Sequence, residues 1–92
     1  MDESEQRNLL METAILGKQA DMFLKSDVGQ YLLARADERC QNAYKALKVV
    51  SPLRERRVRD LQAEIWKCES FRQWLVDAIN EGQYAEEEML ER

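Results

Sequence analysis

The chain has 92 residues, of which 35% are charged and only three are glycine and one is proline, and its formal net charge is −4. This composition is typical of one small helical domain and excludes a β-rich fold, which needs more turn residues. No apolar run approaches the roughly 20 residues that span a bilayer, and the acidic start at residues 1–5 is unlike a secretion signal. We therefore expect a cytoplasmic protein with no membrane contact.

The first expected helix, residues 1–25, has two apolar faces. At helical spacing, one side carries Leu9, Thr13, Leu16, Gly17, Ala20, Phe23 and Leu24. Met11, Ile15 and Met22 lie almost opposite. A surface helix on a small monomer needs only one apolar stripe, because only one side meets the core. The second row therefore predicts another neighbour, either a second copy of the chain or a partner protein.

Two expected helix boundaries divide the rest of the chain. Ser26 and Asp27 can each cap a new helix by accepting a backbone N–H, so the second helix is expected over residues 27–50. Pro52 suits the first position of a helix with Ser51 as its N-cap, which places the third helix at residues 52–80.

The end of the third helix is expected at Gly82, which can act as its C-cap. Residues 83–92 would then form an acidic tail or a short helix. The fold class is therefore all-α, with an N-terminal helix and a long antiparallel hairpin of the second and third helices, in a single domain over residues 1–92.

The hairpin also predicts two cross-helix contacts of charged residues that lie on apolar stripes. Arg39 should lie level with Glu64 and form an ion pair, and Arg72 should lie level with Tyr31. The alternative is that both arginines extend past the apolar surface to water.

Helix three carries more apolar surface than one seam requires. Its main apolar stripe consists of Val58, Leu61, Ile65, Cys68, Leu75 and Ile79. Beside it runs a second strip, which consists of Leu53, Phe71, Trp74 and Ala78. This strip can hold helix one or another subunit. Trp66 lies away from both strips, as expected of a residue at an interface or its rim.

Residue types needed for chemistry are scarce. The chain has no histidine, and its two cysteines, Cys40 and Cys68, are expected to be buried free thiols. Glycines are isolated, so no phosphate-binding loop is present. We expect no catalytic residue, no metal ligand and no cofactor, and therefore no enzyme.

The strongest local charge signal is a run of arginines at the expected start of helix three. It comprises Arg54, Arg56, Arg57 and Arg59. Arginine suits bidentate phosphate contacts, so nucleic acid is one candidate partner. Pairing with the acidic chain ends of another subunit, or a solvated turn, is the alternative. The overall negative charge and the lack of interleaved aromatic residues disfavour nucleic acid.

Two stretches resemble small helical accessory proteins encoded in tailed-phage genomes near head-assembly genes. They are FLKSDVGQYLL at residues 23–33 and LQAEI followed by FRQWLVDAINEG within residues 61–82. The resemblance spans residues 23–90 and consists of helix-packing patterns. It implies a role in the virion or its assembly, in the host cytoplasm or the particle, and assigns no functional residue.

The sequence therefore predicts a non-enzymatic helical protein that self-associates and acts through protein–protein contacts in phage assembly. The interface is expected at Met11, Ile15, Met22, Trp66 and Trp74. One alternative is a phage-encoded inhibitor or regulator of a host protein. Another is nucleic-acid binding through the arginine run.

Overall fold

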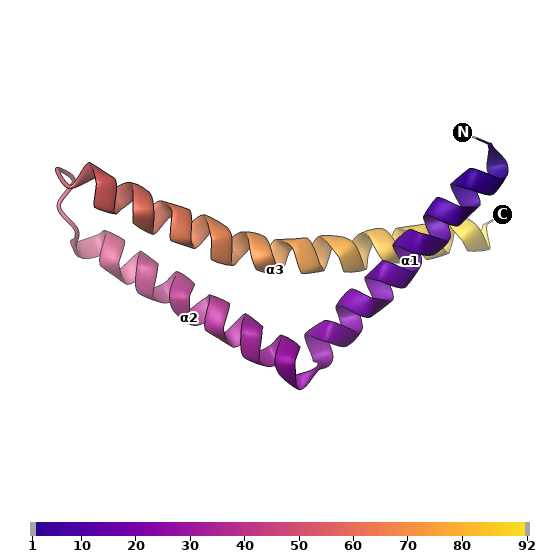
Figure 1. The fold of residues 1–92 in the computed structure, drawn as a ribbon, viewed down its shortest axis with the longest axis horizontal. Helices are drawn as coiled ribbons and strands as arrows, with labels where there is room; N and C mark the ends of the chain where they lie inside the picture. The colour runs from indigo at the N-terminus through magenta and orange to yellow at the C-terminus, as the bar shows by residue number, and fades with distance from the viewer. Residues whose placement is uncertain (1, 92) are drawn as a thin grey trace.

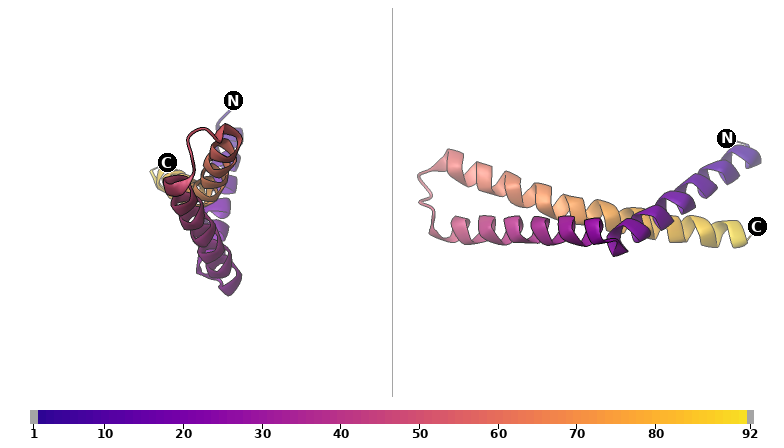
Figure 2. Two further views of the ribbon diagram at one scale, coloured as in Figure 1. Left: turned by 90° about the vertical axis from the view of Figure 1, so that its left-hand side faces the viewer. Right: turned by 60° about the horizontal axis from the view of Figure 1, so that its bottom comes forward.

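A computed structural model describes residues 2–91 and confirms the all-α, three-helix fold class. Helix α1 spans Glu3–Lys25, α2 spans Asp27–Val49 and α3 spans Glu55–Leu90. Helices α2 and α3 form an antiparallel hairpin, and α1 leaves α2 at a sharp corner to cross the second half of α3 (Figure 1). Figure 2 shows that this crossing lies toward the end of α3 that holds both chain termini.

The corner between α1 and α2 lies at Ser26, as predicted. The Ser26 hydroxyl donates to the carbonyl oxygen of Phe23 at 2.6 Å and accepts the N–H of Gly29 at 3.0 Å. A Cβ on Gly29 would lie 1.7 Å from the Phe23 carbonyl oxygen, so only glycine allows the two helix ends to approach this closely.

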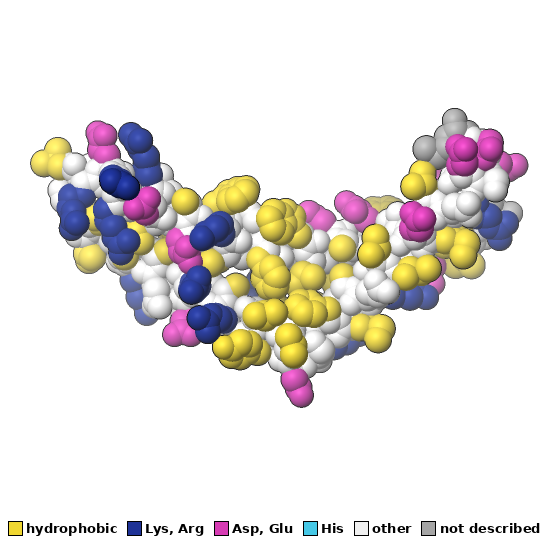
Figure 3. All heavy atoms as spheres, viewed as in Figure 1, with side chains coloured by type: hydrophobic (Ala, Val, Ile, Leu, Met, Phe, Trp, Pro, Cys, Tyr) yellow, Lys and Arg dark blue, Asp and Glu magenta, His cyan; other side chains and the backbone are white. Residues whose placement is uncertain are grey.

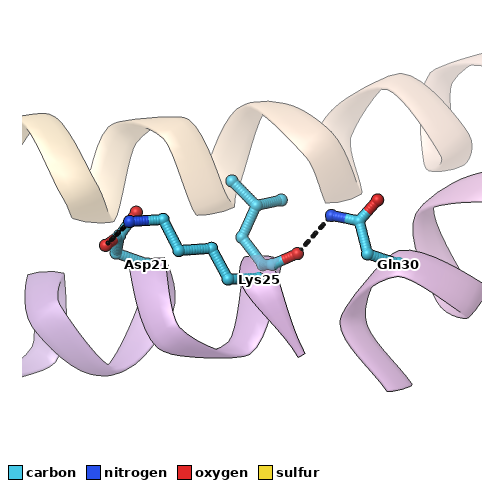
Figure 4. Close-up of polar contacts among 4 residues, drawn as sticks. Asp21, Lys25 and Gln30 are labelled. Atoms are coloured by element: carbon cyan, nitrogen blue, oxygen red, sulfur yellow. Dashed lines mark hydrogen bonds and ion pairs between the residues drawn. The ribbon is translucent and has the colours of Figure 1, made fainter. Parts of the chain in front are cut away.

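A side chain from beyond the corner satisfies one carbonyl group at the end of α1. The Gln30 side-chain nitrogen donates back to the carbonyl oxygen of Leu24, and Lys25 forms an ion pair with Asp21 at 2.9 Å (Figure 4). The last carbonyl groups of a helix lack partners within it. The side chain of Gln30 therefore ties the first turn of α2 to the last turn of α1.

The expected start of helix three at Pro52 is wrong. The carbonyl oxygen of Ser51 accepts the N–H of Arg54 at 3.0 Å, and the Ser51 hydroxyl accepts the N–H of Leu53 at 3.3 Å. These bonds close a turn over residues 51–54, and α3 begins only at Glu55. Ser51 thus caps a turn and not a helix.

The expected end of helix three at Gly82 is also wrong, and residues 83–90 continue α3. Gly82 has helical geometry, since no glycine within residues 2–91 has a positive φ. A Cβ on Gly82 would lie 2.7 Å from the Cα of Gly17, and one on Gly17 would lie 2.8 Å from the carbonyl oxygen of Ala78. Gly82 is therefore a packing residue, where the backbones of α1 and α3 touch.

Small side chains surround this contact. Ala14 of α1 and Ala85 of α3 are buried beside the two glycines. Helices usually pack 8–10 Å apart, and the distance depends on the side chains between them. The glycine pair therefore allows α1 and α3 to pack at the short end of this range of distances.

One of the two predicted contacts across the hairpin is confirmed. Arg39 and Glu64 form an ion pair at 3.6 Å. Arg72 instead binds Asp37, and the hydroxyl of Tyr31 accepts a hydrogen bond from Arg35 at 3.1 Å. Asp37 lies six residues nearer the hairpin turn than Tyr31, and its carboxylate offers the guanidinium of Arg72 an opposite charge, which a tyrosine hydroxyl does not.

The resulting molecule is an open triangle and not a bundle. Its extents are 57 × 32 × 15 Å, and the shortest of these admits one helix crossing another but no third layer. Apart from two leucines, the buried residues are small. The buried apolar residues are Ala14, Leu33, Ala43, Leu61 and Ala85. Among residues 2–91, no large side chain is fully buried.

The glycine contact yields a first prediction. Replacing Gly17 with alanine should raise helix propensity by about 1 kcal/mol, yet lower the free energy of unfolding by about 1–3 kcal/mol, because the added methyl group meets backbone atoms. Urea unfolding followed by circular dichroism at fixed protein concentration measures the change. Asn8→Ala, at an exposed site of α1, is the control and should change stability by less than about 0.5 kcal/mol. A Gly17→Ala protein as stable as the wild type would contradict the close crossing.

Candidate interaction surfaces

Helix α1 presents apolar side chains to solvent on both sides of its contact with α3. Met11, Ile15 and Met22 are 47%, 51% and 69% exposed. Leu9 and Leu16 are also exposed, although the sequence pattern places them on the core-facing side. The reason is that α1 meets α3 through the row containing Ala14 and Gly17, which lies between the two larger rows.

A second exposed apolar group lies on α3. The rings of Trp66 and Trp74 meet edge to face, with centroids 6.5 Å apart and planes at 87°. Both side chains are exposed, and Ser70, one turn from each, is partly buried. Edge-to-face pairs of this kind contribute about 0.5–1.5 kcal/mol beyond the area they bury. The two tryptophans thus form one continuous apolar projection on the surface of α3.

Sequence reasoning places both tryptophans at an interface but misses their contact. Residues eight apart in a helix are not ordinary neighbours, and only large rings bridge two turns. The available signal is the spacing of Trp66, Ser70 and Trp74, which puts a small residue midway between two large ones.

The whole surface is too large for a compact monomer. The accessible area is 7409 Å². A compact chain of this mass exposes about 5,600 Å², which leaves an excess of about 1,800 Å². The radius of gyration is 18.5 Å, against about 12 Å for a compact domain of this length. The excess lies within the range of about 1,000–2,500 Å² per chain that obligate homodimers bury.

Charge is separated along the long axis of the molecule. Figure 3 shows hydrophobic side chains gathered in the middle of the molecule, between α3 and the corner of α1 and α2, most basic side chains in the half that holds the hairpin turn, and acidic side chains near the end that holds the termini. The arginine run lies at this turn, and all four of its arginines are exposed. Arg59 pairs with Glu55 one helical turn away at 3.6 Å.

A polar cluster lies on the hairpin seam. The hydroxyl of Tyr44 donates to Glu69, which also lies 3.9 Å from the sulfur of Cys40. This hydrogen bond raises the pKa of the Tyr44 hydroxyl. Burial, and then the negative charge of Glu69, raise the pKa of the Cys40 thiol. The cluster favours protonated, unreactive groups and offers no activated nucleophile.

Cys68 has a similar environment. Burial and the nearby carboxylate of Glu64, 3.9 Å from its sulfur, raise the pKa of this thiol as well. Both cysteines are free and partly buried. Within residues 2–91, no group of three or more cysteine, aspartate or glutamate side chains is arranged to hold a metal ion.

None of the three helices over residues 2–91 combines the length and the apolar character that crossing a membrane requires. Comparison with protein families, with curated proteins and with solved structures found no match to this chain.

The two cysteines allow a direct test of the seam. Because a raised pKa leaves less thiolate at a given pH, both thiols should react with iodoacetamide more slowly at pH 8 than in the urea-unfolded chain. The pH midpoint of the reaction should also lie above that of the unfolded chain. Mass spectrometry of Cys40→Ser and Cys68→Ser variants assigns a rate to each thiol. Equal rates in folded and unfolded protein would show that the seam does not shield them.

Proposed function

We propose that this protein is a non-enzymatic assembly protein that self-associates through the exposed apolar surface of α1 and the tryptophan pair of α3. The observation that carries the proposal is the excess accessible surface of about 1,800 Å² over a compact monomer. Covering such a surface with a second copy would bury the apolar side chains that the thin fold leaves in water.

The composition of the surface also supports this proposal. Met11 and Ile15 lie one turn apart, and Met22 continues the row toward the corner with α2. Methionine adapts to irregular partner surfaces, and tryptophan is enriched among the residues that dominate binding energy. Because 47–69% of each of these side chains is exposed in the single chain, a contact with another chain would bury apolar surface that the fold leaves in water.

The setting we propose is the assembly of a tailed-phage particle, in the host cytoplasm or within the virion. Support comes from the resemblance of residues 23–33 and 61–82 to small helical proteins encoded near head-assembly genes. An extended helical protein that pairs with itself suits an assembly role, because it can present the same surface twice in one complex.

Light scattering over a wide concentration range tests self-association. The wild type should have a mass above that of one chain, falling toward it only on dilution. The double substitution Met11→Glu, Ile15→Glu should weaken association at least about tenfold, because a charge would then be buried against apolar side chains. Circular dichroism should be unchanged, since both residues are exposed in the single chain.

A matched control adds the same charge at exposed polar positions of α2. Gln41→Glu, Asn42→Glu should leave the mass unchanged. A wild-type mass of one chain at every concentration would overturn self-association. The apolar rows of α1 would then belong to a different protein, as in the inhibitor hypothesis.

A further inference from the structure

The two ends of the molecule carry opposite charge. The hairpin end, residues 45–60, has six basic and two acidic side chains. The open end, residues 2–12 and 81–91, has nine acidic side chains and one basic. These ends lie far apart in one chain, because α3 alone separates Arg57 from Glu87 by about 45 Å.

Charges on opposite ends of one chain do not interact appreciably. The Debye length at physiological salt is about 8 Å, far shorter than the 57 Å long axis. The basic end therefore lacks an acidic partner of similar size within its own chain. Each end is, however, complementary to the other end of a second copy.

This complementarity selects one of the two ways in which two copies can stack about a two-fold axis. A parallel pair would place basic turn on basic turn and acidic end on acidic end. An antiparallel pair places each basic turn on an acidic end and overlaps the two copies along their whole length, with the middle of α3, between Trp66 and Trp74, near the axis. Like-charge contacts disfavour the first arrangement, and complementary charge fixes the register of the second.

We infer that the partner is a second copy of this chain, stacked antiparallel, with the arginine run of each copy against the acidic open end of the other. This inference rests on the proposed self-association and adds its geometry. An end-to-end filament also joins opposite charges, but it covers only the tips and leaves the apolar surface of α1 in water. The antiparallel pair satisfies both features in a closed dimer.

Zero-length coupling of amines to carboxylates with a carbodiimide tests the geometry. Lys45 and Lys48 lie near the hairpin turn, too far from residues 81–91 of the same chain to be coupled to them. Cross-links from these lysines to peptides within residues 81–91, found in the covalent dimer, are expected. A covalent dimer without them would overturn the antiparallel arrangement.

A charge swap tests the energetics. Arg54→Glu, Arg56→Glu, Arg57→Glu should weaken dimerisation at least about tenfold at low salt and less at high salt. Glu81→Lys, Glu87→Lys, Glu91→Lys should do the same. Folding should be preserved, because all three side chains are exposed and lysine at positions 87 and 91 complements the dipole at the end of α3. The combined protein should dimerise within about threefold of the wild type, which also serves as the folding control.

The outcomes separate the two proposals. A dimer that is indifferent to both sets of substitutions, or a mass that grows without limit, would overturn the antiparallel pair and leave self-association standing. A monomeric wild type would overturn both. Arginine substitutions that abolish binding to a duplex DNA probe without changing the dimer would assign the arginine run to nucleic acid instead.

Discussion

The contact between Gly17 and Gly82 is the constraint on which the rest of this structure depends. Backbone touches backbone there, so α1 can cross α3 only at this point and only with its small-residue row facing inward. The tight corner at Ser26 and Gly29 then fixes where α2 begins. Together they direct α1 away from α2 and across the second half of α3, so that the three helices do not form a bundle.

An open triangle follows from this geometry, with consequences for the surface. Rotating Ala14 and Gly17 inward turns the larger side chains of α1 outward on both sides, including Leu16 and Met22. The hairpin contributes the tryptophan pair and, at its far end, the arginine run. Apolar area in the middle and opposite charges at the ends are the features that a second, antiparallel copy would match.

Local sequence signals predict the local structure well. Helical spacing, the Ser26 cap and the Arg39–Glu64 pair all involve residues close in the chain or level across a short hairpin. The errors arise where distant segments meet. Gly82 precedes an acidic segment, so the sequence there has the pattern of a helix end. Its role as the packing partner of Gly17 depends on α1 crossing α3, which no local pattern reveals. The exposure of Leu9 and Leu16 follows from the same contact, so the helical spacing of apolar residues does not predict it either.

The dependence of stability on protein concentration tests most directly whether a second copy of the chain binds the folded triangle. If a second copy binds the folded chain and not the unfolded one, the urea midpoint should rise with concentration, and a hundredfold range above the dissociation constant changes the free energy by about 2.7 kcal/mol. Helix content followed by circular dichroism from micromolar concentrations upward gives that midpoint. A midpoint that rises across the range is the expected result. A midpoint independent of concentration would mean that the open triangle is stable alone, contradicting the claim that its exposed surface is completed by another chain.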